Sequence, residues 1–287
     1  MSGNREFGAF CGRKTAQAGA VAFPPLRTVI NRATHFDLVP IGDAWCHNRF
    51  DGPFWTSSAA NRPAVSIVFV QSRNGNTATD DPASLGAGET DTHLIYEGLS
   101  RIAADGVAVG AATLHSDSFF SVWRRELVDA RIARGLPVHP AQIVLTHTGR
   151  VDVEGTRLFN VRGVPVYVLT SPEGRERLAR PLHARPWVCA IVADGPDALD
   201  RQMNELFSRG QHRISCVGGR RTASAFVDAG VARDLYLTTS PREGGVPHTP
   251  WYVGTRPPSL ERVLAKTWEE PDGIVRFEHF LLKVPSA

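Results

Sequence analysis

The stretch ISCVGGRRT, residues 214–222, passes from a short apolar run through two glycines into the start of a predicted helix. A strand that ends in glycines at a helix N-terminus presents free backbone N–H groups and the positive end of the helix dipole to an anion. Loops of this kind hold phosphate groups. Because Gly-Gly is also an ordinary tight turn, the stretch by itself leaves both interpretations open.

Strands and helices alternate on both sides of this stretch. The apolar pattern predicts strands at 64–70, 107–109, 142–146, 164–170, 187–193, 214–217 and 234–239, and helices at 90–104, 119–134, 198–209 and 222–228. This alternation indicates βαβ units, and therefore an α/β fold whose mainly parallel sheet has helices on both faces. Two late strands, 263–268 and 274–282, flank the turn sequence EPDG at 270–273, which predicts an antiparallel C-terminal hairpin.

Residues 1–62 differ in character from the rest of the chain. They are rich in Gly, Pro, Asn and single aromatic residues, and they show no regular apolar period. We predict that 1–62 is an irregular N-terminal extension wrapped on the core, and that 63–287 forms one domain. The hydrophobic content of 42% is sufficient for a sizeable core.

Charge and cysteine usage narrow the function classes. The chain has 32 basic and 29 acidic residues, spread without the Lys/Arg blocks of a nucleic-acid or membrane-binding surface. Its four cysteines lie far apart and form no Cys-x-x-Cys pair, so neither a zinc site nor a disulfide framework is indicated. The apolar run at 18–23 is too short for a signal core. We therefore expect a cytoplasmic protein that binds a small-molecule substrate, with no metal, nucleic acid or membrane involved.

Five motifs occur in an order that resembles the reductase domain of riboflavin biosynthesis. They are SRNG at 72–75, a helix carrying Arg101, VGAATLHSD at 109–117, the strand-Gly-Gly-helix at 214–222 and GVARDLYLTTSP at 230–241. The resemblance covers roughly residue 63 to the C-terminus. It implies a three-layer dihydrofolate-reductase-like fold and the reduction of 5-amino-6-(5-phosphoribosylamino)uracil with NADPH. It also implies a homodimer.

The resemblance assigns one set of residues to the nicotinamide cofactor. Most of them lie in the glycine loop and in the motif after the second strand of the domain. The resemblance also places the loop 146–150 near the adenosine 2′-phosphate. The residue types agree with this, since hydroxyl, imidazole and guanidinium groups at a strand's C-terminal end suit a phosphomonoester. A plain polar loop is an equal alternative there. The assigned residues are Thr113, Asp117, Thr146, His147, Arg150, Gly218, Gly219, Arg220, Arg221 and Thr222.

Four further residues are assigned to the substrate, and one to catalysis. Arg101 and Arg124 match positions where the family grips the ribose phosphate, although each alone is also typical of a solvated helix face. Ser72 and Asn74 follow the first strand of the domain, where parallel sheets place ligands, but Asn-Gly is also a turn signal. Asp117 is the predicted catalytic residue, which would orient a proton donor, bind a ribose hydroxyl or cap the following helix.

Val217 departs from the family pattern. The family has a substrate-binding glutamate at this position, and its loss removes a polar contact that a polar pyrimidine would need. Three functions therefore stay open. They are a reductase of the riboflavin-pathway pyrimidine, a reductase of the same fold acting on another small molecule, and a non-catalytic nucleotide-binding or structural module. If the third function is correct, we expect NADPH not to raise the thermal stability of the protein, whereas a protein that binds NADPH is stabilised by mass action.

Overall fold

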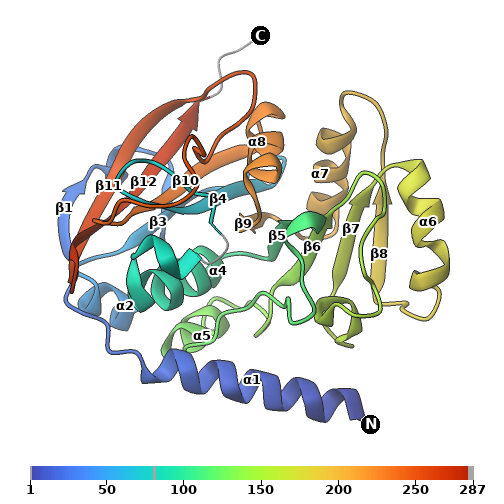
Figure 1. Ribbon diagram of the computed structural model, residues 1–287, viewed down its shortest axis with the longest axis horizontal. Coiled ribbons are helices and arrows are strands. Elements are labelled where there is room, and N and C mark those ends of the chain that lie inside the picture. Colours follow the sequence, from blue (N-terminus) through green and yellow to red (C-terminus); the bar gives the residue numbers. More distant parts are fainter. Residues whose placement is uncertain (1, 80–81, 284–287) are drawn as a thin grey trace.

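One large β-sheet organises the molecule (Figure 1). The computed structural model describes residues 2–79 and 82–283. Within those residues, ten strands pair in the order β1-β11-β12-β10-β4-β9-β5-β6-β7-β8. The strands from β10 to β8 in that order run parallel. These are β4 (Ala64–Gln71), β5 (Gly106–Gly110), β6 (Ala141–Leu145), β7 (Val166–Thr170), β8 (Val188–Val192), β9 (Arg213–Cys216) and β10 (Ala232–Thr239).

The other end of the sheet is antiparallel. Strand β12 (Gly273–Lys283) pairs antiparallel with β10 and with β11 (Ser259–Glu270), and β11 pairs antiparallel with β1 (Arg27–Asn31). Glu270 and Gly273 pair directly across the hairpin turn. Gly273 has φ of 128°, which favours glycine. The predicted mainly parallel sheet with an antiparallel C-terminal hairpin is therefore confirmed.

Helices cover both faces of the sheet because side chains alternate along each strand. Val65 and Ile67 of β4 pack with α7 and α8, whereas Val68 packs on the other face with η3, α4 and α5. Helix α6 packs on β7 through Leu178. This gives the three layers predicted. The helices are α3 (Gly88–Thr90), the π-helix η3 (Asp91–Leu99), α4 (Ser100–Ile102), α5 (Arg125–Ile132), α6 (Pro172–Leu182), α7 (Ala198–Ser208) and α8 (Arg220–Asp228).

The prediction that residues 1–62 are irregular is wrong. They contain α1 (Ser2–Ala20), the sheet strand β1, and a small sheet of β2 (Leu38–Ile41) and β3 (Phe54–Ser57) around α2 (Ala44–Arg49). Helix α1 lies along the lower edge of the view in Figure 1. Its glycines and polar residues hide the helical pattern, and packing of Phe10 and Ala18 on the domain stabilises it. No helix in the described part of the chain is long and apolar enough to cross a bilayer.

Within residues 63–287, the limits of the helices predicted at 119–134 and 90–104 differ in ways that bear on the site, and one helix was missed. Residues 119–123 are not helical, because the Gln142 side chain bonds both the N–H and the carbonyl of Phe120, each at 2.9 Å. The helix after β4 begins at Gly88, before the predicted start at residue 90, so Asp91 lies inside the helix. The missed helix, α6, starts with Ser171 accepting from Gly174 N at 3.1 Å. Short 3-10 turns are η1 (Ala33–His35), η2 (Pro82–Leu85), η4 (Ala111–Thr113) and η5 (Arg157–Asn160).

A buried polar network joins β3 to the large sheet. Asp234 of β10 accepts from Ser57 Oγ at 2.9 Å and from Ser57 N at 3.1 Å. On the neighbouring strands, His279 Nε2 lies 2.7 Å from Asp234 Oδ1, and Ser66 Oγ donates to Oδ2 at 3.4 Å. The Asp234 and His279 side chains are fully buried. The N-terminal segment is therefore fixed to the domain by hydrogen bonds as well as by apolar packing.

Candidate functional site

A cavity of about 530 Å³ lies at the carboxyl ends of the central strands β4, β9 and β5. Parallel sheets commonly bind ligands at this edge. Three parts of the chain form most of its wall: the end of β4, the first turns of the helix that follows β4, and the glycine loop between β9 and α8. The lining comprises Val68, Phe69, Val70, Thr77, Ala78, Thr79, Ala87, Gly88, Asp91, Thr92, Tyr96, Thr113, Val217, Gly219 and Arg220.

The glycine loop lies directly on the end of β5. A Cβ atom added to Gly218 would lie 2.7 Å from Cα of Val109 and 2.8 Å from N of Gly110, so this approach requires glycine. One turn later, the Thr222 hydroxyl packs against Gly110. Helix α8 begins at Arg220, and its N-cap, Gly219, makes no side-chain capping bond. The loop therefore turns the N-terminus of a helix toward the cavity, an arrangement that favours an anion.

Thr113 reaches the cavity from the opposite side of this loop. It ends η4, directly after β5, and a Cβ on Gly219 would lie 3.3 Å from its hydroxyl oxygen. The structure thus brings together Thr113, Gly218, Gly219 and Arg220 of the predicted cofactor residues. Arg221 is exposed and does not line the cavity.

The predicted 2′-phosphate loop lies at the same edge of the sheet, outside the cavity lining. Thr146 is buried at the end of β6 and donates its N–H to Leu169 O at 3.0 Å. The His147 carbonyl accepts from Ser171 Oγ at 2.7 Å, which ties the loop to the start of α6. The side chains of His147 and Arg150 are exposed. Their contact with a cofactor stays a prediction.

Asp117 makes an ion pair outside the cavity. Its Oδ1 lies 2.6 Å from Arg157 Nη2, and this hydrogen bond and the guanidinium charge hold the pKa of the carboxyl below its usual value. Asp117 is exposed and does not line the cavity. It does not cap a helix either, because α5 begins eight residues later, at Arg125. The capping role is therefore wrong, whereas a catalytic or ribose-binding role of Asp117 stays a prediction.

Ser72 and Asn74 form a turn and do not line the cavity. Ser72 is fully buried, and its hydroxyl contacts Gly244 O at 2.9 Å and Asn74 Oδ1 at 2.5 Å. The Ser72 hydroxyl is thus used within the protein. Among the two interpretations of the Ser-x-Asn-Gly motif, the geometry favours the turn.

Of the two predicted phosphate-binding arginines, Arg124 is engaged by the protein, whereas Nε and Nη2 of Arg101 have no hydrogen-bond partner within the described residues. Arg124 Nη1 donates to Val21 O at 2.7 Å and to Ala18 O at 3.1 Å, satisfying carbonyls at the C-terminal end of α1. Arg101 is buried, donates to Ser121 O at 2.6 Å and stacks on the Tyr96 ring at 4.6 Å. Arg101 therefore borders the cavity behind Tyr96, whereas Arg124 does not line it.

Asp91 is the site residue that sequence reasoning missed. It lines the cavity, is 7% exposed, and begins the π-helix η3, a conformation frequent at functional sites. Burial raises the pKa of its carboxyl to about 7. The available signal was the spacing to Leu94, Ile95 and Gly98, which places an acid on the apolar face of the helix.

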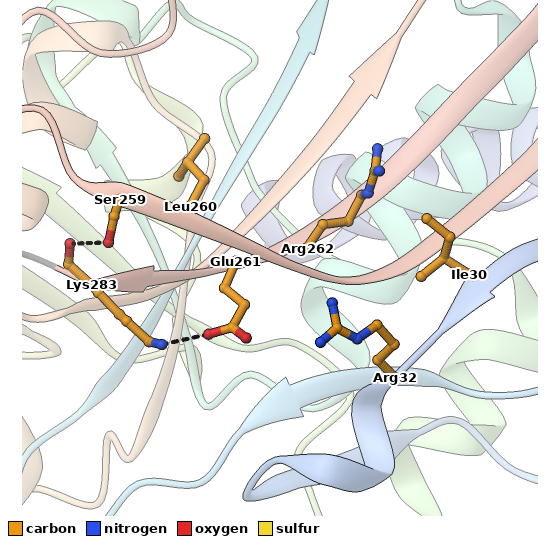
Figure 2. Close-up of a pocket in the computed structure, with 7 residues that line it drawn as sticks. All are labelled: Ile30, Arg32, Ser259, Leu260, Glu261, Arg262 and Lys283. Atoms are coloured by element: carbon orange, nitrogen blue, oxygen red, sulfur yellow. Dashed lines mark hydrogen bonds and ion pairs between the residues drawn. The ribbon is translucent and has the colours of Figure 1, made fainter.

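A second cavity, of about 440 Å³, lies between β1, β11 and β12, away from all the predicted site residues. Figure 2 shows its lining, in which Lys283 Nζ donates to Glu261 Oε2 at 2.5 Å. Arg262 pairs with Glu278 at 2.5 Å. Because the first cavity lies at the carboxyl edge of the parallel strands and includes predicted site residues, it is the candidate site. Within residues 2–79 and 82–283, no three His, Cys, Asp or Glu side chains gather as a metal site would require.

The fold has solved counterparts. A pyrimidine reductase-like protein from Corynebacterium diphtheriae matches with a TM-score of 0.59 and 20% identity, over 79% of this chain and 94% of that one. RibD of Acinetobacter baumannii matches with a TM-score of 0.56 and 18% identity, over 78% of this chain and 59% of that one. No protein-family model and no curated protein sequence matches the chain.

The name of a third solved structure with a similar fold states an enzymatic activity. It is the diaminohydroxyphosphoribosylaminopyrimidine deaminase/5-amino-6-(5-phosphoribosylamino)uracil reductase from Thermotoga maritima, with a TM-score of 0.55 and 19% identity, over 77% of this chain and 57% of that one. The chain thus spans less than two thirds of the two RibD-type proteins. The resemblance inferred from the motifs is confirmed at the level of the fold.

Proposed function

We propose that the protein is an NADPH-dependent reductase of a small molecule that binds in the cavity between η3 and the glycine loop. The observation that carries the proposal is the placement of Gly218 on the end of β5. It turns the uncapped N-terminus of α8 toward a cavity at the carboxyl edge of the sheet. The shared fold with pyrimidine reductases agrees with this proposal.

The residues present fit a dinucleotide phosphate. The first N–H groups of α8 and the Arg220 guanidinium would hold the pyrophosphate, and Thr113 would bond it from the other side of the loop. His147 and Arg150, exposed at the same edge of the sheet, would meet the 2′-phosphate of NADPH. The bound cofactor supplies a hydride, and the protein supplies alignment and the exclusion of water. The homodimer expected from the resemblance stays a prediction.

Two substrates are candidates. The first is 5-amino-6-(5-phosphoribosylamino)uracil, which the name of the Thermotoga counterpart includes. The second is a different small molecule without a ribose phosphate, and two observations favour it. Val217 gives the cavity wall an apolar side chain at the family's glutamate position, and the Arg124 guanidinium is bonded to carbonyls of α1 and its following loop. A phosphorylated pyrimidine would find neither partner in the cavity.

Turnover of the riboflavin-pathway pyrimidine separates these candidates. We expect the wild-type protein to oxidise NADPH no faster with that pyrimidine than without it, and Val217→Glu alone to restore no activity, because Arg124 stays engaged. NADPH absorbance measures both. Val70→Glu places the same carboxyl elsewhere on the cavity wall and serves as the control. Robust wild-type turnover, or a gain of about ten-fold or more in Val217→Glu but not in Val70→Glu, would assign the pyrimidine as the substrate.

A further inference from the structure

We propose that the cavity between β1, β11 and β12 is a second ligand site, which binds a free α-amino acid with an apolar side chain. This edge cavity has a volume of about 440 Å³ and is lined by Ile30, Arg32, Ser259, Leu260, Glu261, Arg262 and Lys283. It shares no lining residue with the cavity at the glycine loop. The two sites are therefore separate, and the edge cavity lies outside the proposed reductase function.

The edge cavity forms where the N-terminal segment meets the C-terminal hairpin. Strand β1 is the outermost strand of the large sheet and pairs with β11. The pairing of β11 with β12 changes register between Arg262 and Leu264, and Val263 is the extra residue. The carbonyl of Val263 accepts from Arg32 N at 2.7 Å, which fixes the Arg32 backbone beside β11. Bulges of this kind are frequent at sheet edges and next to functional sites, because they redirect side chains.

Arg32 brings a guanidinium group without a partner to this cavity. Its side chain is exposed, and it makes no hydrogen bond or ion pair within residues 2–79 and 82–283. Figure 2 shows the guanidinium directed toward Glu261, on the side opposite Lys283. The parallel N–H groups of a guanidinium match the two oxygens of a carboxylate. Arg32 is therefore placed to bind the carboxylate of a ligand.

Glu261 brings the opposite charge to the same cavity. Its Oε2 accepts from Lys283 Nζ at 2.5 Å, while its Oε1 makes no hydrogen bond in the part of the chain that the structure describes. One carboxylate oxygen is thus open to the ammonium group of a ligand. The Lys283 side chain is 65% exposed, and exposed pairs contribute little to stability. Because an ammonium has three N–H donors, Lys283 keeps two for the carboxylate of the ligand.

The third basic residue of the lining is turned away from this group. Arg262 pairs with Glu278 of β12 at 2.5 Å, and Figure 2 shows its guanidinium directed away from Glu261. The charges that a ligand would meet are therefore two positive groups, on Arg32 and Lys283, and the negative group of Glu261. A zwitterion has a favourable partner for each of its charges here. A dianion such as a phosphomonoester would lie beside the Glu261 carboxylate, and like charges repel.

Two apolar side chains complete the wall of the edge cavity. Ile30 of β1 is half-buried, and Leu260 of β11 is 43% exposed. An apolar side chain of a ligand placed against them would remove apolar surface from water. The cavity volume lies within the range of small-molecule sites, about 300–1,000 Å³. An amino acid such as leucine thus matches the guanidinium, the carboxylate and the apolar part of the wall.

Chemical-shift mapping by NMR tests this site, with L-leucine as the probe. In amide spectra of the full chain, leucine titrated to about 10 mM should shift the signals of residues 30–32 and 259–263 and leave those of 217–223 unchanged. Two comparison compounds each lack one charge of leucine: 4-methylpentanoate has no ammonium group, and 3-methylbutylamine has no carboxylate. Each should bind about ten-fold or more weakly than leucine, because one charged contact is lost.

Two variants assign the contacts. Arg32→Gln should weaken leucine by about ten-fold and should not weaken 3-methylbutylamine, which has no carboxylate for the guanidinium. Glu261→Gln should weaken leucine and 3-methylbutylamine but not 4-methylpentanoate. Both variants should fold, because Arg32 makes no side-chain bond within the described residues and the pair of Glu261 with Lys283 is exposed. Arg27→Gln changes an exposed arginine of β1 outside the cavity lining and should bind leucine as the wild type does.

Three outcomes would overturn the inference. The first is an absence of leucine-dependent shifts at 30–32 and 259–263, including the case in which shifts occur at 217–223 instead. The second is binding of inorganic phosphate or 4-methylpentanoate as tight as that of leucine, which would indicate a site for anions in general. The third is wild-type leucine affinity in Arg32→Gln. None of these measurements uses NADPH, so a failure of the proposed reductase function would leave their outcome unchanged.

Discussion

Gly218→Ala is expected to weaken NADPH binding by about ten-fold or more, which corresponds to about 1.4 kcal/mol. The added Cβ would lie within 2.8 Å of two backbone atoms of β5, and neither backbone atom can rotate away as a flexible side chain could. The loop must therefore lift from the strand, and the N-terminus of α8 moves with it. Overpacking of this kind costs about 1–3 kcal/mol, so the free energy of unfolding should also fall.

Calorimetric titration of NADPH into wild type and Gly218→Ala measures the first effect. Gly244→Ala is the matched control, because a Cβ at that glycine meets nothing within 4 Å and its φ is not positive. The control should bind NADPH as the wild type does. Wild-type affinity in Gly218→Ala would mean that the glycine loop does not hold the cofactor.

Asp234→Ala is expected to lower the free energy of unfolding by about 3–5 kcal/mol, because removing one member of a buried pair leaves its partner uncompensated. Ser57 N, Ser57 Oγ and His279 Nε2 would each lose an acceptor in the interior. An unpaired buried polar group costs about 1–3 kcal/mol by itself. Since the Ser57 bonds join β3 to β10, the N-terminal segment should also become easier to cleave.

Urea denaturation followed by fluorescence measures this loss, and limited proteolysis locates it. Asp129→Ala is the control, because Asp129 forms an exposed pair with Arg125 at 4.0 Å, and such pairs contribute less than about 1 kcal/mol. A loss in Asp234→Ala no larger than in the control would show that the network does not hold the small sheet of β2 and β3 on the domain. If the protease first cleaved the C-terminal strands of Asp234→Ala, the loss of stability would not be located in the N-terminal segment.

The central sheet could be predicted from the sequence because local signals there agree with the tertiary structure. A parallel strand buried on both faces gives a continuous apolar run, as in 64–70, and each run is separated from the next by a helical period or a turn. The position of the glycine loop could also be predicted from the sequence. Only glycine permits the close approach of Gly218 to the backbone of β5.

The N-terminal segment could not be predicted in the same way. Helix α1 contains Gly8, Gly12 and Gly19, which have low helix propensity, and it forms because the domain packs against it. The packing of α1 on the domain also explains why Arg124 is not free to bind a ligand. Its guanidinium bonds carbonyls at the end of α1, a partner that no local pattern around residue 124 announces.

Asp91 and Asp117 show how far the sequence can predict individual residues of the site. Asp117 follows a predicted strand and Asp91 lies near the start of the predicted helix 90–104, and helix spacing alone favours Asp91 as the acid on an apolar face. Tertiary structure buries Asp91 in the cavity and leaves Asp117 on the surface beside Arg157. The difference arises from helix limits, because the helix containing Asp91 starts at Gly88 and α5 starts only at Arg125.

Hydrogen–deuterium exchange of the full chain with and without saturating NADPH tests the central claim most directly. The account predicts slower exchange for the amides of residues 217–223 and 110–114, because the cofactor would lie on the glycine loop and beside Thr113. It also predicts that NADPH slows 146–150 more than NADH does, through the 2′-phosphate. Unchanged exchange at 217–223 in NADPH, or protection confined to a different edge of the sheet, would contradict the account.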